Sequence, residues 1–253
     1  MVETMQKILD RIERGNEHAK NATAKKVYGC EKCKDTEWIL TTDENGLQYA
    51  THCTCWEKKA AKRLLTASGI SEEDSRKGFK SFETFGENAL INAKETASRY
   101  YSDFLKIEKE RVNSIILCGA SGRGKTTLGM AISNNLIHRC IGVRYMPYRD
   151  EITRLKQEVT DEYAYNAHIG RLKNARVLFI DDMLKGRVTE SDTNILYEVI
   201  NHRYLAKLPL IISTEKTTQE LLEYDEAIGS RLLEMSKGYI VEFDKSTPNY
   251  RLR

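Results

Sequence analysis

Short apolar runs alternate with helical patterns along most of the chain after residue 79. Five runs have the length of buried strands: 114–118, 143–146, 176–180, 210–213 and 239–243. Apolar residues at three- and four-residue spacing predict helices before and between them, over 88–108, 124–139, 148–158, 192–205 and 217–234. Because this alternation is typical of a parallel sheet covered by helices on both faces, we predict an α/β domain with a parallel five-stranded sheet over residues 79–253.

The first 78 residues follow a different pattern. Apolar residues at helical spacing predict a helix near the start of the chain: Val2, Met5, Ile8, Leu9 and Ile12. Two β-rich runs, 38–42 and 47–51, flank Asn45-Gly46, a dipeptide typical of hairpin turns. A second helix is expected from Trp56 to Gly69. The polar stretch 71–78 then separates a small α+β module, residues 1–78, from the α/β domain.

Composition narrows the class of protein only a little. The chain has 253 residues, 40% hydrophobic and 30% charged, which is typical of a soluble globular protein. A net charge of +3 is too small to indicate nucleic-acid binding by bulk charge, so any DNA contact must be local. No apolar run approaches the roughly 18–20 residues that cross a bilayer, and the N-terminus is charged. These features predict a cytoplasmic protein without a membrane partner.

Residues 119–126 fit the phosphate-binding motif G-x-x-x-x-G-K-[ST] in full, between a predicted strand and a predicted helix. Glycines allow the tight turn that points backbone N–H groups at phosphate oxygens, and the helix dipole favours the same anion. Lys125 is expected to reach the β- and γ-phosphates of ATP, and Thr126 to ligate Mg²⁺. The predicted nucleotide ligands are Gly119, Ala120, Ser121, Gly122, Arg123, Gly124, Lys125, Thr126 and Thr127.

A pair of carboxylates ends the apolar run at 176–180. Asp181 is expected to hold Mg²⁺ through water, and Asp182 to orient or deprotonate the attacking water. The alternative is an ordinary acidic turn after a buried strand. An acid beside the Mg²⁺ ligand favours an ATPase over a nucleoside kinase, for which no second-substrate motif is visible. Because Asp182 is one methylene shorter than glutamate, we expect slow or conditional hydrolysis.

Two later residues complete the predicted site. Thr214 ends the strand at 210–213, where a hydroxyl could sense the γ-phosphate of ATP. Arg231 lies on a predicted helix far from the phosphate loop in sequence, and could stabilise charge in the active site of a neighbouring subunit. Spacing alone favours a plainer interpretation of Arg231, as a solvated helix charge.

Four cysteines within a 26-residue window form the pattern C-x2-C, 19 residues, C-x-C: Cys30, Cys33, Cys53 and Cys55. Four thiolates suit tetrahedral Zn²⁺, and the predicted hairpin returns the second pair to the first. The second pair is one residue shorter than usual, so His52 could replace a neighbouring ligand. Free thiols in a small core are the alternative. A module of this size needs metal for its folding energy.

The motif order resembles the AAA+ ATPases, specifically the DnaC/DnaI-type replicative helicase loaders. The segments that carry the resemblance are FKSFETF (79–85), CGASGRGKTTL (118–128), VLFIDDMLKGRVTESDTNILYEVINHRY (177–204), PLIISTEKT (209–217), AIGSRLLEM (227–235) and NYRLR (249–253). The resemblance implies that Arg231 is an arginine finger and that Arg251 is a late nucleotide-binding arginine. It also implies self-association, and cysteine pairs in a region that binds the helicase.

Two departures from the family pattern affect these expectations. Glu215 occupies a stretch where loaders often carry asparagine, so phosphate sensing is assigned to Thr214. Only ten residues follow Phe243, too few for the helical lid that many AAA+ proteins carry. Nucleotide retention is then expected to depend on the neighbouring subunit.

The sequence therefore predicts an ATP-dependent loader of a hexameric replicative DNA helicase, acting on single-stranded DNA. Candidate DNA contacts are Lys185, Arg187, Arg144 and Arg149, which the sequence cannot separate from ordinary surface charges. One alternative is an IstB-type transposition-helper ATPase, which shares the ATPase core. A second is a zinc adaptor in which nucleotide is only a structural ligand.

Overall fold

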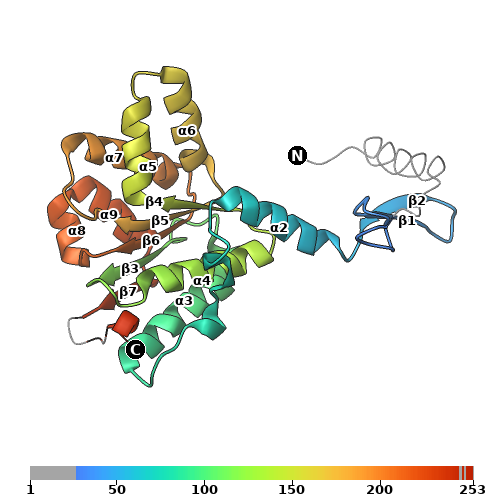
Figure 1. Ribbon diagram of the computed structural model, residues 1–253, viewed down its shortest axis with the longest axis horizontal. Coiled ribbons are helices and arrows are strands. Elements are labelled where there is room, and N and C mark those ends of the chain that lie inside the picture. The colour runs from blue at the N-terminus through green and yellow to red at the C-terminus, as the bar shows by residue number, and fades with distance from the viewer. Residues whose placement is uncertain (1–26, 245–246, 248, 253) are drawn as a thin grey trace. The chain divides into compact units, whose positions relative to one another are not determined.

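The computed structural model describes residues 27–244, 247 and 249–252 (Figure 1). The helix predicted from Val2 to Ile12 lies outside these residues. The chain divides after Lys62 into two compact units, each described here by itself. No helix within the described part of the chain is both long and apolar enough to cross a membrane.

The first unit contains the predicted hairpin. Strands β1 (Trp38–Thr42) and β2 (Gln48–His52) pair antiparallel, with Trp38 opposite His52. In the connecting loop, Gly46 has φ +82°, a left-handed conformation that glycine adopts without steric cost. Helix α2 (Trp56–Ser68) follows directly, and Gly69 at φ +81° ends it. The hairpin and this helix are confirmed.

The division between the units comes earlier than the predicted boundary near residue 78. Residues after Lys62 belong to the second unit, in which Ile70 is buried. The Asn134 side-chain amide donates to the backbone carbonyls of Asp74, at 2.8 Å, and Lys77, at 2.7 Å. The polar side chains of residues 71–78 did not indicate this attachment, because the segment contributes backbone carbonyls to it and not side chains. Two short 3-10 turns follow in this segment, Asp74–Arg76 and Phe79–Ser81.

The second unit is built on a parallel sheet. Its strands are β3 (Ile115–Gly119), β4 (Val143–Pro147), β5 (Val177–Met183), β6 (Leu210–Thr214) and β7 (Ile240–Phe243). They lie in the order β4-β5-β6-β3-β7 and every pairing is parallel (Figure 1). The predicted five-stranded parallel sheet is confirmed. The carboxyl ends of β3, β5 and β6 therefore meet at one edge of the sheet.

Helices cover both faces of this sheet, as predicted. On one face lie α3 (Asn88–Ile107) and α4 (Lys125–His138); on the other lie α5 (Tyr148–Glu158), α7 (Glu190–Leu205) and α9 (Glu226–Met235) (Figure 1). The remaining helices are α6 (Glu162–Asn174) and α8 (Thr218–Tyr224), and a 3-10 turn spans Tyr250–Leu252.

Two helical predictions were incomplete. Helix α6 was not predicted, since it buries just His168, Ile169 and Leu172 and so has a weak apolar stripe. The helix predicted over 217–234 is two helices, because Asp225 adopts an extended conformation between them. Its side chain accepts a hydrogen bond from the backbone N–H of Ile228 and caps α9.

Candidate nucleotide-binding site and cysteine cluster

The phosphate loop joins β3 to α4. Gly119, Gly122 and Gly124 have φ values of +117°, +75° and +86°, which L-residues with side chains rarely adopt. A Cβ atom on Gly119 would also lie 2.3 Å from the backbone oxygen of Phe243 on the neighbouring strand. Two constraints, backbone conformation and close strand packing, therefore require glycine at this position.

Lys125 is the first residue of α4 and is 5% exposed. Its ammonium donates to the carbonyl oxygens of Gly119, at 2.6 Å, and Ala120, at 2.8 Å. Burial lowers the pKa of Lys125, and the nearby carboxylates of Glu215 and Asp182 oppose that shift. The loop thus holds a cation beside the positive end of a helix dipole, which is an arrangement suited to phosphate.

Asp181 joins residues from three strands and the phosphate-loop helix. Its Oδ1 atom accepts hydrogen bonds from the hydroxyls of Thr126, at 2.9 Å, and Ser213, while Oδ2 accepts from the Tyr145 hydroxyl at 3.1 Å. Burial raises the pKa of Asp181, although these donors act in the opposite direction. The structure therefore places Thr126 and Asp181, the two predicted Mg²⁺ ligands, in direct contact.

Asp182 lies one residue further, at a bulge in the pairing of β5 with β6. Its φ of +53° is left-handed, which is rare outside functional or strained turns. It lines a hollow of about 60 Å³ together with residues 121–127 of the phosphate loop. Its carboxylate accepts a hydrogen bond from the ammonium of Lys185 at 2.7 Å.

Ser213 is a residue of the site that the sequence did not predict. Its hydroxyl accepts from the backbone N–H of Asp182, at 2.8 Å, and donates to the Asp181 carboxylate, so it fixes both acidic residues. Thr214, by contrast, is buried and donates to the carbonyl of Met183 at 2.8 Å. This geometry does not support Thr214 as the γ-phosphate sensor. Adjacent residues of a strand point to opposite faces of the sheet, so Ser213 and Thr214 on β6 could have been expected to have different surroundings.

The C-terminal segment lies against the phosphate loop. The Tyr250 backbone N–H donates to the Gly122 carbonyl at 2.6 Å, and its hydroxyl accepts from the Glu83 N–H at 3.0 Å. Its ring stacks on Phe82, with centroids 4.9 Å apart. Tyr250 thus lines the same hollow as Asp182. The Arg251 side chain lies outside the described part of the structure, so its predicted role stays a prediction.

Arg231 is held on α9 against two tyrosines of α7. Its guanidinium carbon lies 5.5 Å from the ring centroid of Tyr197 and 5.3 Å from that of Tyr204. One guanidinium nitrogen donates to the Ala227 carbonyl of the same helix at 2.7 Å. The buried Nε atom has no hydrogen-bond partner among the described residues. The side chain is thus partly buried and packed on aromatic rings, and its role as an arginine finger stays a prediction.

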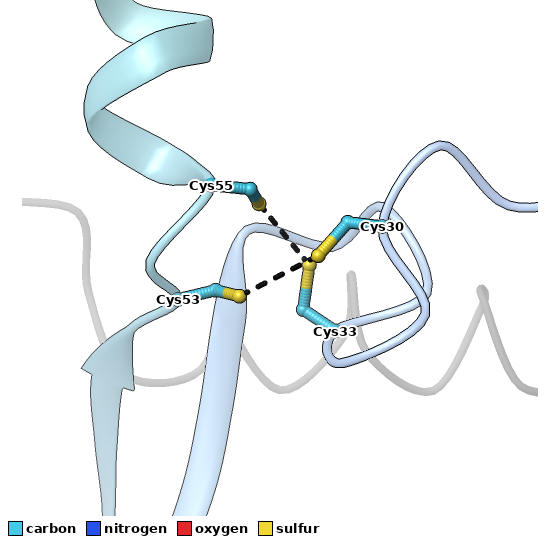
Figure 2. A group of neighbouring side chains, drawn as sticks. All are labelled: Cys30, Cys33, Cys53 and Cys55. Carbon is cyan, nitrogen blue, oxygen red and sulfur yellow. Dashed lines mark hydrogen bonds between the residues drawn. The ribbon is translucent and has the colours of Figure 1, made fainter.

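The four predicted metal-binding cysteines come together in the first unit (Figure 2). Their sulfur atoms all lie within 4.8 Å of one another; Cys30 and Cys53 are 3.7 Å apart, and Cys33 and Cys55 are 3.5 Å apart. Sulfur atoms around a tetrahedral zinc, at about 2.3 Å from the metal, would be about 3.8 Å apart. The cluster therefore has the composition and spacing of a zinc site.

The thiols of this cluster differ in acidity. A hydrogen bond from the backbone of Cys33 lowers the pKa of Cys30 to about 6, whereas burial raises the pKa of Cys55 to about 12. His52 is not part of the cluster: its ring lies between those of Trp38 and Trp56, at centroid distances of 3.9 and 4.2 Å. The suggestion that His52 replaces a cysteine is therefore not supported.

Asp35 supports the loop that carries the first cysteine pair. Its carboxylate accepts from the backbone N–H groups of Gly29, at 2.9 Å, and Cys30, at 3.1 Å. It also pairs with the ammonium of Lys59 at 2.7 Å, which lowers the pKa of Asp35. The loop and the start of α2 are thus tied together around the sulfur atoms.

The four candidate DNA-contacting residues lie in three places, since Lys185 pairs with Asp182 and Glu215 beside the phosphate loop. Arg149 and Arg187 lie together, since the Arg149 guanidinium donates to the Arg187 carbonyl at 2.8 Å. With Lys156 they line a groove of about 380 Å³. Arg144 lies on the edge strand β4 and contacts the Ala67 carbonyl instead. Of the candidate DNA contacts, Arg149 and Arg187 therefore lie together, and Arg144 lies elsewhere.

Comparison with known proteins agrees with this architecture. The sequence profile of the family described as "IstB-like ATP binding protein" matches residues 63–235. The phage-like element PBSX protein XkdC of Bacillus subtilis is 37% identical over 251 residues, which cover 94% of this chain and 92% of that protein.

Solved structures show the same fold. A DnaI crystal structure superposes with a TM-score of 0.58 and 20% identity, over 72% of this chain and 95% of that one. A structure of the DnaC helicase loader gives a TM-score of 0.55 and 18% identity, over 69% and 100%. At these identities the likeness shows the fold alone, while the profile match and the identity to XkdC show the family. This chain therefore belongs to the family of IstB-like ATP-binding proteins.

Proposed function

We propose that this protein is an Mg²⁺-dependent ATPase that loads a hexameric replicative DNA helicase onto single-stranded DNA. The observation that carries the proposal is the joining of the phosphate loop, Thr126, Asp181 and Ser213 into one hydrogen-bonded site on a loader-type fold. The cysteine cluster ahead of that fold supplies a separate recognition module.

The site has a role for each residue in ATP hydrolysis. Lys125 binds the β- and γ-phosphates, and Thr126 with Asp181 would hold an Mg²⁺ ion, which would offset phosphate charge. Asp182 accepts a proton from water as the water oxygen bonds to the γ-phosphorus. The bond from that phosphorus to the β–γ bridging oxygen breaks, and ADP leaves. Ser213 keeps Asp181 and Asp182 in register during this step.

Self-association completes the proposed site. Arg231 is proposed to act on the nucleotide of a neighbouring subunit, and its packing on Tyr197 and Tyr204, which holds the guanidinium in place, supports this role. A guanidinium fixed by aromatic rings loses little conformational entropy when it meets a phosphate. Hydrolysis is then coupled to assembly.

We expect one tightly bound Zn²⁺ per chain, held by Cys30, Cys33, Cys53 and Cys55. A strong chelator should unfold the first unit and leave the second folded, because most of the hydrophobic core lies in the α/β unit. Metal analysis of reduced protein measures the stoichiometry. Circular dichroism with and without chelator, in parallel with ATP binding, measures the separate responses.

A matched variant sharpens this test. Cys118→Ser removes a buried thiol of β3 outside the cluster and should leave the zinc content unchanged, whereas Cys33→Ser should lower it. Less than half an equivalent of zinc in freshly purified protein, or equal zinc content in both variants, would contradict the assignment.

Single-stranded DNA is proposed to bind along the groove of Arg149, Arg187 and Lys156. Arg149 and Arg187 are exposed and adjacent, while Lys156 is already paired with Asp192 at 2.8 Å. Contacts from these arginines to phosphates release counterions, so binding should weaken as salt rises. The proposed location of the protein is the cytoplasm, where these partners meet.

The first 78 residues are proposed to bind the helicase, and we expect a chain lacking residues 1–55 to lose that binding. The deletion retains α2 and the entire α/β unit, so ATP binding should persist as a folding control. Size-exclusion chromatography of each chain with the host helicase measures co-elution. Co-elution of the shortened chain would place the helicase contact on the ATPase unit and contradict this division of labour.

A second candidate function is a transposition-helper ATPase of the IstB type. The family match favours it, since the matched residues 63–235 all lie within the ATPase unit and leave the cysteine cluster outside. The chromatography above separates the two functions when a cognate transposase replaces the helicase. A zinc adaptor that binds ATP without hydrolysis is the third alternative, and turnover assays with and without single-stranded DNA distinguish it.

A further inference from the structure

Lys185 forms a cationic bridge between two carboxylates beside the phosphate loop. Its ammonium lies 2.7 Å from Oδ2 of Asp182 and 3.4 Å from Oε1 of Glu215. Asp182 lies near the end of β5, whereas Glu215 follows β6, so one lysine connects the ends of two adjacent strands. Neither the phosphate motif nor the acidic motif assigns a role to this residue.

The bridge interferes with the role proposed for Asp182. The ammonium occupies one lone pair of Oδ2 and holds the carboxylate in one orientation, so it competes with an attacking water for Asp182. The hydrogen bond from Lys185 is short and charge-assisted, and the same contact raises the pKa of Lys185. Lys185 therefore stays protonated and keeps Asp182 engaged.

The same geometry allows release. The side chains of Lys185, Asp182 and Glu215 are 41%, 37% and 38% exposed, so a solute anion can reach the ammonium. Beside them lies a hollow of about 490 Å³ whose rim includes a second cation, Lys216. After Lys185 the chain turns at Gly186, which has φ +80°, and reaches the exposed Arg187. A phosphodiester chain bound at Arg187 would thus lie two residues along the chain from Lys185.

We propose that Lys185 is a positioning residue that restrains Asp182 until a phosphate of single-stranded DNA draws its ammonium away. Glu215 is the second anchor that keeps the lysine near the site after release. This inference rests on the proposed function, because it assumes that Asp182 is the base for ATP hydrolysis. It explains how DNA binding can stimulate hydrolysis without a change in the phosphate loop.

Lys185→Met in the full-length protein tests the restraint. Without DNA, the variant should turn over saturating ATP about two to five times faster than the unsubstituted protein, since a partly exposed ion pair is weak. Added oligothymidylate should stimulate the unsubstituted protein and leave the variant unchanged. The KM for ATP should stay the same, because Lys185 is expected to affect the chemical step alone.

Three further variants separate the restraint by Lys185 from general charge effects. Lys216→Met removes a cation from the same hollow without touching Asp182 and should preserve DNA stimulation. Lys185→Arg keeps a cation within reach of Asp182 and should restore the low DNA-free rate. Glu215→Gln removes the second anchor and should reduce the stimulation by oligothymidylate.

The outcomes distinguish this inference from the proposed function. A slower Lys185→Met variant would show that the lysine assists hydrolysis directly, and an unchanged rate would show that it does not restrain Asp182; both overturn the inference. If neither protein hydrolyses ATP although both bind it, hydrolysis itself and the restraint fail together. Hydrolysis that persists while Lys185→Met has no effect leaves the ATPase assignment standing and overturns the inference alone.

Discussion

Arg231→Ala should lower the ATP hydrolysis rate of the assembled protein by about 10³-fold, the lower end of the effect of arginine fingers. The guanidinium is expected to stabilise charge that develops on the γ-phosphate in a neighbouring subunit, so its loss removes transition-state stabilisation. ATP binding to the isolated chain should be unchanged, because no described contact joins Arg231 to the phosphate loop of its own chain. Steady-state turnover and nucleotide titration measure the two quantities.

Mixing Arg231→Ala with Lys125→Ala protein tests whether the arginine acts between subunits. An interface that pairs an intact phosphate loop with an intact arginine should recover part of the activity. Arg111→Ala is a matched control: Arg111 also packs on Tyr204, at 4.1 Å from its ring centroid, yet lies outside the proposed site. No recovery at any mixing ratio, despite demonstrated co-assembly, would assign Arg231 a role within its own subunit.

Asp182→Asn should retain ATP binding and reduce hydrolysis by about 10²–10⁴-fold, the usual contribution of a general base. The amide has nearly the same size as the carboxylate, but it cannot accept the proton of the attacking water. The backbone N–H of residue 182 still donates to Ser213, so the turn should keep its conformation. Single-turnover hydrolysis and equilibrium ATP binding measure the two effects separately.

Asp181→Asn is the matched comparison for that experiment. Asp181 contacts Thr126 directly, so its loss should weaken Mg²⁺-dependent ATP binding rather than the chemical step alone. The two neighbouring carboxylates are thereby assigned different roles by the same pair of assays. A normal hydrolysis rate in Asp182→Asn would require a different base, and Glu215 would be the next candidate.

Local patterns in the sequence were sufficient where a backbone conformation or a period determines the structure. The phosphate loop was predictable because positive φ angles at Gly119, Gly122 and Gly124 require glycine at fixed spacing. The sheet was predictable because buried parallel strands are short apolar runs. The hairpin between the cysteine pairs was predictable from Asn45-Gly46, and it places the four sulfur atoms together.

Long-range contacts were not predictable in the same way. Ser213 and Thr214 are adjacent hydroxyl residues, and only the pairing of β5 with β6 decides which of them meets Asp181. Arg203 illustrates the same limit: it is fully buried and donates to the carbonyl oxygens of Leu172 and Pro209. Nothing next to it in sequence shows that helix and strand ends converge there.

The amino-acid sequence by itself thus indicated the family, the five strands and most of the helices, and the candidate residues for phosphate and metal binding. Residue type and spacing suffice for these, because they follow from backbone conformation and hydrophobic period. The tertiary structure decided the partners: Lys185 with Asp182, Tyr250 with the phosphate loop, and Arg231 with two tyrosines. These contacts join residues whose separation in space depends on strand order and helix packing, which no local pattern specifies.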